Sequence, residues 1–372
     1  MIKTVTPAEG ALTVAWAEGG ASRYPYMWLR DNCACAHCRD PRNGQRLFDA
    51  LDLPAEPRPE RTAVKGDAVT VLWSGENHES RYPEAWLVAH DPSPSARARR
   101  RRHMVLWGAE IAGNLPQAGW PRVLAEPQEE RRLLQALADH GFAVLHRVPL
   151  EPGQVAAVGD RLGHVRVTNY GRLFDVISIP NPNNLAYTSV ALGVHTDNPY
   201  RDPTPGLQLL HCLEAGAPGG DTLLVDGFRA AEALRQRHPN DFALLARLPL
   251  PFHFADAKAD LQATTPIVST DFEGRVTAVH FNNRSMAALD LPEEQILPWY
   301  RAYRHFAAIL REPAGELRIR LEPGDLLIME NNRALHGRTA FDPSRGRRHL
   351  QGCYVDKDGV ESRRRVLERS VA

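Results

Sequence analysis

The residues best suited to chemistry in this chain are His195 and Asp197, which are separated by one residue in the string V-H-T-D-N-P. On an extended segment such residues leave the same face, so an imidazole and a carboxylate can bind one small cation. His336, in N-N-R-A-L-H-G-R, is the candidate for a third ligand. Two histidines and one carboxylate on one side of a metal leave the other side open, as in non-haem Fe(II) oxygenases. An H-x-D pair alone more often marks polar loop residues, so this hypothesis depends on its neighbours.

Two further residues fit a co-substrate site beside such a metal. Thr222 follows the flexible turn G-G-D, and Arg348 lies twelve residues beyond His336. A dicarboxylate that chelates a metal at one end needs a cationic partner at the other, and arginine can give a carboxylate two parallel hydrogen bonds. A threonine hydroxyl can add a third. The alternative for Arg348 is a surface ion pair, because Arg345, Arg347 and His349 surround it.

The first ninety residues contain an internal repeat. The string T-V-A-W, followed by S-R-Y-P and W-L, returns later as T-V-L-W, S-R-Y-P and W-L. Each copy predicts a β-hairpin, with a glycine-containing turn between two short strands.

A cysteine cluster follows the first copy of the repeat, and His90 follows the second at nearly the same offset. We therefore predict that the ends of the two hairpins meet at one tetrahedral Zn²⁺, bound by Cys33, Cys35, Cys38 and His90. A Cys₃His set fills every position on zinc, which predicts a structural site rather than a catalytic one. His37, inside the cluster, could replace His90, and buried free thiols are the plain alternative.

Composition limits the possible functions. The 372 residues carry 45 Lys+Arg and 45 Asp+Glu, so no global charge attracts nucleic acid or a membrane. The five cysteines are an odd number, and the spacing of the three in the cluster indicates a metal site rather than a disulfide framework. The N-terminal residues lack the apolar core of a signal peptide, and no run is long enough to cross a bilayer. We expect a cytoplasmic protein.

The order of predicted elements favours a mainly β fold with inserted helices. The pattern predicts helices over 127–141, 151–162, 227–237 and 293–310. It predicts short strands over 142–145, 176–179, 206–212, 222–225, 276–281, 317–321, 325–329 and 348–355. Many short strands with helices between them indicate a β-sandwich or jelly roll, which can bring His195 and His336 together.

The predicted domains are an N-terminal zinc-binding β domain (1–95), a linker (96–126) and a catalytic domain (127–372). The boundary is drawn at the stretch 91–102, which holds two prolines and five arginines and predicts a solvated linker. A nucleic-acid-binding patch is the sharper alternative, but no aromatic residues are interleaved with the arginines.

Taken together, these strings resemble a known family. H-T-D-N-P, G-G-D-T-L-L-V-D-G-F, N-N-R-A-L-H-G-R and R-H-L-Q-G-C-Y-V-D resemble the γ-butyrobetaine hydroxylase branch of the taurine dioxygenase superfamily. The cysteine cluster followed by W-L-V-A-H resembles that branch's N-terminal zinc domain. The resemblance covers essentially the whole chain. It implies a double-stranded β-helix enzyme, usually a homodimer, that uses Fe(II), 2-oxoglutarate and O₂ and releases succinate and CO₂.

The resemblance also implies roles for single residues. His195, Asp197 and His336 match iron ligands, and Thr222 and Arg348 match the 2-oxoglutarate carboxylate site, with Asn184 as a further co-substrate contact. The family's substrates carry a trimethylammonium group, which offers no hydrogen-bond donor and is bound by aromatic rings. The residues at the matching positions are Tyr170, Phe174, Tyr187 and Tyr354. Each of them taken singly would more often be core packing.

The chain departs from γ-butyrobetaine hydroxylases at the predicted anion site. Asn198 stands where the animal enzymes look to have a tyrosine for the substrate carboxylate. The string F-N-N-R places Arg284 beside Asn283. Two amides and a guanidinium suit an anion with more charge and more oxygens than a carboxylate. This pattern is similar to the related branch that acts on 2-(trimethylammonio)ethylphosphonate, which we favour over γ-butyrobetaine hydroxylation to carnitine and over trimethyllysine hydroxylation. The alternative of another class is a metal-stabilised binding protein without catalysis, against which the intact set of site residues argues.

Overall fold

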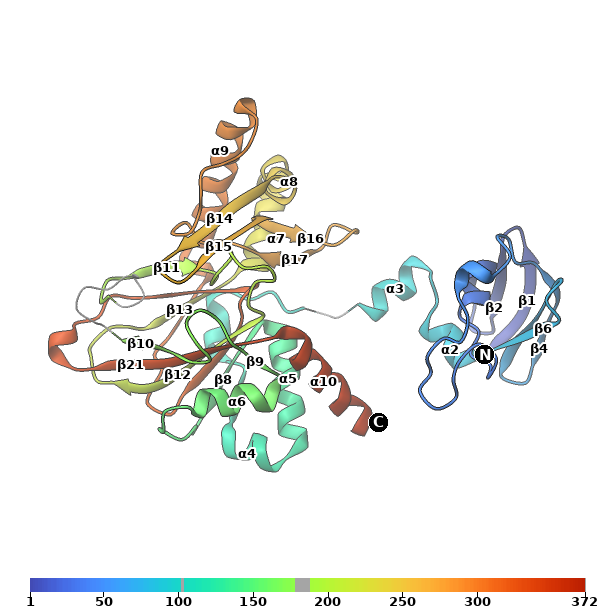
Figure 1. The fold of residues 1–372 in the computed structure, drawn as a ribbon, viewed down its shortest axis with the longest axis horizontal. Coiled ribbons are helices and arrows are strands. Elements are labelled where there is room, and N and C mark those ends of the chain that lie inside the picture. Colours follow the sequence, from blue (N-terminus) through green and yellow to red (C-terminus); the bar gives the residue numbers. More distant parts are fainter. Residues whose placement is uncertain (102–103, 178–187, 372) are drawn as a thin grey trace. The chain divides into compact units, whose positions relative to one another are not determined.

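The computed structural model describes residues 1–101, 104–177 and 188–371, and the chain divides into two compact units, Met1–His103 and Met104–Ala372 (Figure 1). Each unit is described by itself below. None of the helices in these described ranges combines the length and the apolarity that crossing a membrane requires.

The N-terminal unit consists of two similar three-stranded antiparallel sheets, each followed by a short helix. In the first copy β1 (Ile2–Ala8), β2 (Ala11–Trp16) and β3 (Ala21–Pro25) precede α1 (Tyr26–Asp31). In the second copy β4 (Pro59–Lys65), β5 (Ala68–Trp73) and β6 (His78–Pro83) precede α2 (Glu84–Ala89). The predicted hairpins are the pairs β2–β3 and β5–β6. Beside each hairpin lies a third strand, β1 or β4, that the sequence pattern did not indicate.

The two copies contact each other reciprocally. The Tyr24 hydroxyl donates to the Leu87 carbonyl (2.8 Å), and the Tyr82 hydroxyl donates to the Leu29 carbonyl (2.6 Å). Both tyrosines and both leucines are buried in one shared core. Because each copy gives the other the same contact, the two copies are related as by a two-fold axis.

The boundary stretch is more regular than a solvated linker. Residues Pro94–Arg100 form α3, which Ser93 caps by accepting a hydrogen bond from the backbone N–H of Ala96 (3.3 Å). Proline at the first helical position fits this start, because its missing N–H would have had no partner there. Further along, the predicted linker 96–126 holds a 3₁₀ turn (Ala109–Gly113), β7 (Gln117–Gly119) and α4 (Trp120–Ala125).

The C-terminal unit is built on two sheets with inserted helices, antiparallel except for the parallel pair β7–β8, which confirms the predicted mainly β jelly-roll class. The larger sheet has the order β10-β21-β12-β19-β8-β7, with β9 (Val165–Arg166) paired to β21, and the smaller has the order β11-β20-β13-β18. The bounds in the larger sheet are β8 (Phe142–His146), β10 (Phe174–Ile177), β12 (Leu207–Ala215), β19 (Leu326–Glu330) and β21 (Arg348–Val355). Those in the smaller sheet are β11 (Leu192–His195), β13 (Thr222–Asp226), β18 (Glu316–Ile319) and β20 (Ala334–Arg338).

A single apolar core joins the two sheets. It combines Phe142, Leu210 and Met329 of the larger sheet with Leu224 and Leu317 of the smaller sheet. These strands read as nearly continuous apolar runs, since one face meets the opposite sheet and the other is covered by helices.

Helices cover the outer faces of this framework. The helices α4, α5 (Pro127–His140), α6 (Gln154–Leu162) and α10 (Lys357–Val371) contribute to the core on the larger sheet (Figure 1). Glu130 of α5 is fully buried and accepts from Arg161 of α6 (2.7 Å) and from Arg363 of α10 (2.8 Å). One carboxylate thus joins three helices, and these two arginines lower its pKa against the opposing effect of burial.

A second group of helices lies beside two small hairpin sheets. Helices α7 (Gly227–Arg237), α8 (Pro239–Arg247) and α9 (Glu293–Leu310) share a core with the hairpins. These hairpins are β14 (Pro249–Ala255) with β15 (Asp260–Pro266), and β16 (Val268–Thr270) with β17 (Val276–Val279). The predictions for α7 and α9 are confirmed to the residue, and that for α5 to within one residue. Helices α8 and α10 and the hairpin of β14 and β15 were not predicted.

Candidate functional site

Two histidines of the smaller sheet face each other across neighbouring strands. His195 ends β11 and pairs directly with His336 of β20, and Asp197 follows two residues later. The Nε2 atoms of His195 and His336 lie 3.3 and 3.9 Å from Oδ1 of Asp197. The structure therefore brings the three predicted ligands together, although 141 positions separate the strand partners His195 and His336 in sequence.

The electrostatics of this group suit a cation. Burial, followed by the charge of His195, lowers the pKa of His336 to about 3, so its imidazole is neutral and can donate a lone pair. Burial raises the pKa of Asp197, but the hydrogen bond from His195 and the other groups around the carboxylate outweigh this effect and hold the pKa far below its usual range. His195 Nδ1 contacts the Gly193 carbonyl (2.9 Å), which directs Nε2 toward Asp197. A buried carboxylate beside two imidazoles is the donor set of an Fe(II) site.

Another cluster of possible ligands shows a different geometry. His238, Asp241 and His305 lie at the junction of α7, α8 and α9, and His305 Nδ1 contacts Asp241 Oδ2 (2.7 Å). The two imidazole rings stack with 4.2 Å between centroids and only 14° between planes, whereas the rings of His195 and His336 are tilted by 45°. Lone pairs of imidazoles lie in the ring plane, so parallel rings do not direct them to one point. We interpret this cluster as a contact between helices.

A cavity opens directly beside His195, Asp197 and His336. Apolar side chains from both sheets form part of its wall, and they include Val176, Leu192, Leu210 and Leu350. The polar residues at its border are Tyr170, Asp197, Asn198, Gln208, Thr222, Arg284, Arg338, Arg348 and Tyr354. An apolar cavity with a few convergent polar groups is the usual form of a small-molecule site.

The predicted co-substrate residues lie together at this cavity. Thr222 is buried at the start of β13, and Arg348 begins β21. Arg348 Nε donates to the Gly220 carbonyl (3.2 Å), and a Cβ at Gly220 would lie 2.7 Å from the Arg348 side chain. The glycine turn therefore makes room for the guanidinium. Burial is the main cause that lowers the pKa of Arg348. In such a poorly hydrated environment a cationic side chain binds an anionic ligand strongly.

Three of the four predicted aromatic residues border the cavity. Phe174 and Tyr354 lie with their rings 5.1 Å apart, and Tyr170 is the third. Phe174 packs over Gly352, where a Cβ would come within 2.5 Å of the ring. Tyr187 and the predicted co-substrate contact Asn184 lie outside the described residues.

Asn198 is an anion-binding candidate with a fixed orientation. The Tyr200 hydroxyl donates to its Oδ1 (2.6 Å), and Tyr170 and Tyr200 hydroxyls are 3.0 Å apart. Asn198 is only 6% exposed, yet its Nδ2 has no protein partner within the described part of the chain. A buried donor without a partner is costly, so this amide is suited to a ligand that accepts a hydrogen bond.

The two remaining predicted contacts differ from each other. Arg284 is exposed like its neighbour but borders the cavity, where desolvation lowers its pKa and the charges of Asp197 and Tyr200 raise it. Asn283 is exposed and is not among the bordering residues. Its neighbour Asn282 is buried, but its side chain donates to the Thr196 carbonyl (3.0 Å).

Sequence reasoning missed three residues that shape this site. Arg338 lies two residues beyond His336 on the same strand and borders the cavity. The alternation of side chains along a strand was the signal that could have found it, since residues two apart share a face. Gln208 is a polar residue within the apolar run of β12, and its side chain contacts Asp197. Asn331 binds the Asp197 backbone at both N–H (2.7 Å) and C=O (2.9 Å). Its pairing partner is 134 positions away, which no local pattern indicates.

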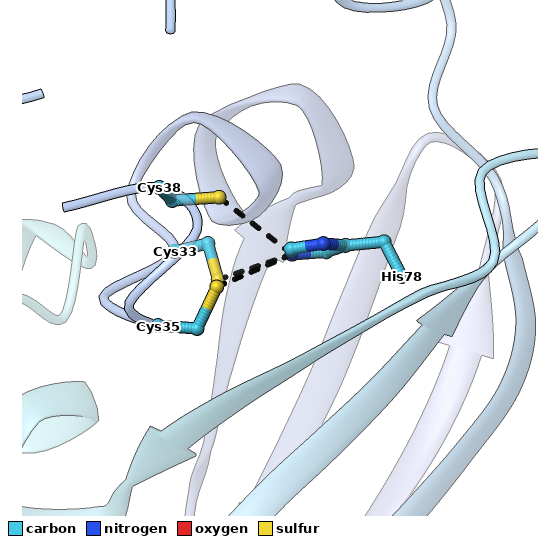
Figure 2. A group of neighbouring side chains, drawn as sticks. All are labelled: Cys33, Cys35, Cys38 and His78. Carbon is cyan, nitrogen blue, oxygen red and sulfur yellow. Dashed lines mark hydrogen bonds between the residues drawn. The ribbon is translucent and has the colours of Figure 1, made fainter. Parts of the chain in front are cut away.

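The cysteine cluster of the N-terminal unit surrounds a histidine other than the predicted one. Figure 2 shows the three sulfur atoms directed at the ring of His78, with Nε2 at 3.4, 3.9 and 3.7 Å from Cys33, Cys35 and Cys38. Neighbouring ligands of a tetrahedral zinc are roughly 3.6 Å apart, given bonds of about 2.0–2.3 Å. Burial is the main cause that lowers the pKa of His78, and the lower pKa favours the neutral imidazole. The four donor atoms thus fit one zinc ion.

The prediction that His90 completes this set was wrong. His90 ends α2, is exposed, and stacks on Trp86 (4.5 Å). It occupies the same position after its helix as Asn32 does after α1. Residues at matching positions of two copies related by a two-fold axis meet only if they lie on that axis, so the ends of the two helices do not come together at one ion. His37, the second candidate, is also exposed.

The sequence did contain a signal for His78. A tryptophan Nε1 bonds a serine Oγ in both copies at 2.8 Å, from Trp16 to Ser22 and from Trp73 to Ser80. The two pairs are six and seven residues apart, so the second turn is one residue longer. His78 is the first residue of β6 and directly follows this longer turn, so the fourth ligand lies where the two copies differ in length.

Comparison with known proteins agrees with this two-part structure. Residues 94–354 match the family described as taurine catabolism dioxygenase TauD, TfdA. Residues 4–88 match the N-terminal domain described as gamma-butyrobetaine hydroxylase-like.

Several characterised relatives align over nearly the whole chain. A gamma-butyrobetaine dioxygenase from Pseudomonas sp. (strain AK-1) is 37% identical, covering 96% of this chain and 94% of the relative. The trimethyllysine dioxygenase of Meyerozyma guilliermondii is 32% identical, with 96% and 93% covered. The human gamma-butyrobetaine dioxygenase is also 32% identical, with 97% and 95% covered.

Among solved structures, a taurine dioxygenase from Burkholderia xenovorans covers 70% of this chain and 94% of its own, at 16% identity and a TM-score of 0.49. The family is established by the sequence matches, which span both units. The chain belongs to the TauD, TfdA family and is an Fe(II)- and 2-oxoglutarate-dependent dioxygenase of the γ-butyrobetaine and trimethyllysine hydroxylase type.

Proposed function

We propose that this enzyme hydroxylates a small trimethylammonium compound with an anionic far end, and that the favoured substrate is 2-(trimethylammonio)ethylphosphonate, converted to its 1-hydroxy product. The observation that carries the proposal is the Asn198 amide. Its buried Nδ2 lacks a partner among the described residues and borders the same cavity as the aromatic rings and Arg284.

In this proposal His195, Asp197 and His336 hold the iron, and Thr222 and Arg348 bind the far carboxylate of 2-oxoglutarate. The iron, when bound, supplies the activation of O₂ that C–H hydroxylation needs. The protein fixes the geometry, since the cavity beside the three ligands has both apolar walls and the polar groups that would orient the substrate. Asn184 remains a predicted co-substrate contact.

The cationic end of the substrate is assigned to Tyr170, Phe174 and Tyr354, with Tyr187 as a predicted fourth ring. A quaternary ammonium cannot donate a conventional hydrogen bond, so ring faces are the suitable partners. Phe174 and Tyr354 form a tilted pair, which leaves ring surface available at the cavity.

The anionic end is assigned to Asn198 and Arg284. Asn283, which was predicted with them, does not border the cavity and is left out of the proposal. A phosphonate offers three oxygens and more negative charge than a carboxylate. It can therefore accept from the Asn198 amide and still face the guanidinium, and hydrogen bonds to charged groups are the stronger kind.

A second candidate is γ-butyrobetaine, whose hydroxylation gives carnitine. It is supported by the relative at 37% identity, which carries the name gamma-butyrobetaine dioxygenase. This substrate would use the same aromatic rings and place a carboxylate near Asn198. The two candidates differ in how strongly they depend on Arg284.

Replacement of Arg284 by alanine separates these candidates. A charged hydrogen bond contributes about 1.5–3 kcal/mol, so kcat/KM for the phosphonate should fall roughly ten- to a hundredfold. The carboxylate carries less charge and should lose less. The matched control is Arg247→Ala, which removes an exposed arginine of α8.

The measurement is succinate formed with each substrate by the Fe(II)-loaded enzyme, for wild type and both variants. A wild-type preference for γ-butyrobetaine that Arg284→Ala leaves unchanged would overturn the phosphonate assignment. Equal losses with both substrates would assign Arg284 to a general role at the cavity.

We also propose that Cys33, Cys35, Cys38 and His78 bind a structural Zn²⁺. His78→Ala should lower the zinc content of purified protein well below one equivalent and lower the melting temperature of the N-terminal unit, because a metal site of this kind contributes directly to folding. His90→Ala is the control and should retain the metal. Elemental analysis that finds full zinc in His78→Ala would contradict the assignment.

Two expectations from the sequence complete the proposal. The enzyme is expected to act in the cytoplasm and to form a homodimer. Light scattering on the purified full-length chain measures the second directly, and a monomer mass at micromolar concentration would contradict it.

A further inference from the structure

The two oxygens of the Asp197 carboxylate have different partners. Oδ1 faces the Nε2 atoms of His195 and His336 at 3.3 and 3.9 Å. Oδ2 accepts two hydrogen bonds, from Gln208 Nε2 (2.7 Å) and from the Tyr354 hydroxyl (2.8 Å). Only Oδ1 is therefore directed at the position between the histidines.

The two donors to Oδ2 come from one cross-strand pair. Gln208 of β12 and Tyr354 of β21 are direct partners in the larger sheet, so both side chains leave the same face. They are 3% and 5% exposed, respectively. The donors are thus fixed by the sheet itself, while Asp197 lies just beyond the end of β11 in the smaller sheet.

The backbone of Asp197 is fixed as well. Asn331 bonds its N–H and its C=O and also donates to the Pro205 carbonyl (3.1 Å). With the backbone held in this way, the remaining freedom of the side chain is rotation of the carboxylate about its last bond. That rotation would exchange the two oxygens or turn both of them toward the histidines.

We propose that Gln208 and Tyr354 are positioning residues that hold Asp197 as a ligand through Oδ1 alone. A carboxylate that bound the metal with both oxygens would occupy a coordination position that 2-oxoglutarate or O₂ requires. Two hydrogen bonds on Oδ2 prevent this, because its lone pairs are already engaged. The proposal rests on the iron-ligand assignment made above.

This inference gives Tyr354 two separable tasks. Its ring borders the cavity beside Phe174, where the substrate cation is assigned, and its hydroxyl bonds Asp197. Tyr354→Phe removes the second task and keeps the first. Gln208→Met removes the other donor while keeping a side chain of similar length.

The test uses apoprotein of the full chain loaded with Mn²⁺, which prefers oxygen and nitrogen ligands to thiolates and so avoids the cysteine cluster. Mn²⁺ affinity is measured by electron paramagnetic resonance, and 2-oxoglutarate affinity by calorimetry on the Mn²⁺ complex. The variants are Tyr354→Phe, Gln208→Met and the double variant. The control is Tyr300→Phe, which removes the hydroxyl of an exposed tyrosine of α9 that does not border the cavity.

We expect the double variant to lose about tenfold or more in 2-oxoglutarate affinity, a typical effect of losing outer-shell partners of a metal ligand. Its Mn²⁺ affinity should change several times less, because a carboxylate that binds through both oxygens keeps the metal. Each single variant should show part of this loss of 2-oxoglutarate affinity, and Tyr300→Phe should show none of it.

Unchanged 2-oxoglutarate affinity in the double variant overturns the proposal. So does a loss of Mn²⁺ affinity alone, since that result means that the two donors only support the ligand. Failure of the ligand assignment itself would look different, because His336→Ala would then bind Mn²⁺ as tightly as wild type.

Discussion

Replacing His336 by alanine should remove succinate formation altogether, within the sensitivity of the assay. His336 Nε2 is one of three donor atoms that converge within 4.8 Å, and its low pKa keeps it neutral and available as a ligand. Loss of outer-shell partners already costs about 10–100-fold in metal affinity or activity, so loss of a ligand should cost more than about a hundredfold.

The matched control is His253→Ala, which removes an exposed histidine that contacts Asp260 (2.9 Å). It should retain activity. Circular dichroism and the melting temperature should be nearly unchanged in both variants, because His336 lies at the border of the cavity. A folded His336→Ala protein with substantial turnover would show that the iron is bound elsewhere.

The largest effect on stability is expected from Arg333→Met. Arg333 and Asp226 form an ion pair (3.2 Å) in which both side chains are almost fully buried, at 1% and 0% exposure. Arg333 also donates to the carbonyls of Asp139 and Val105. Breaking a buried pair by removing one partner costs about 3–5 kcal/mol, because the other charge stays buried without compensation.

The consequence is measurable as a melting temperature. A loss of this size should lower the melting transition of the C-terminal unit by roughly 6–20 °C, given about 2–4 °C per kcal/mol for domains of this size. The control is Arg237→Met, which breaks an exposed pair with Glu312 and should cost at most about 1 kcal/mol. A shift in Arg333→Met no larger than in Arg237→Met would contradict the argument.

The loss should also depend on pH. Burial raises the pKa of Asp226, and Arg333 opposes that rise. Without Arg333 the pKa should rise further, so the carboxyl takes up a proton more readily in the folded variant. The destabilisation relative to wild type should then shrink as pH falls, since the protonated acid carries no buried charge. Arg333→Met with Asp226→Asn should recover part of the stability for the same reason.

How much of this molecule could be predicted follows from how local each signal is. The periodic apolar residues of α7 and α9 fixed both helices to the residue, because a helix is specified by its own sequence. The ligands His195, Asp197 and His336 were found because their types are rare in combination. Arg333 was overlooked because its partner is 107 positions away.

Other parts were missed because local rules opposed them. The strand β14 contains Pro249 and Pro251, which argue against a strand in a sheet interior. The structure places it in a two-stranded hairpin, where one side of each strand needs no partner. Asn283 was chosen over Asn282 because sequence alone does not show which of two adjacent amides turns toward the backbone of residue 196.

The reciprocal contacts of the N-terminal unit have a consequence for its origin. In an isologous dimer interface, residue i of one subunit contacts residue j of the other, and j of the first contacts i of the second. The tyrosine and leucine contacts of the two copies follow this pattern. The module is thus organised as two subunits joined in one chain, which is what duplication and fusion of a self-pairing half would produce. The position after the helix then diverged. After α1 it is Cys33 of the metal site, and after α2, beyond His90, it is Asp91, which accepts a hydrogen bond from Ser22 (2.6 Å). Matching positions of the two copies thus belong to a metal site at one end and to a hydrogen bond at the other.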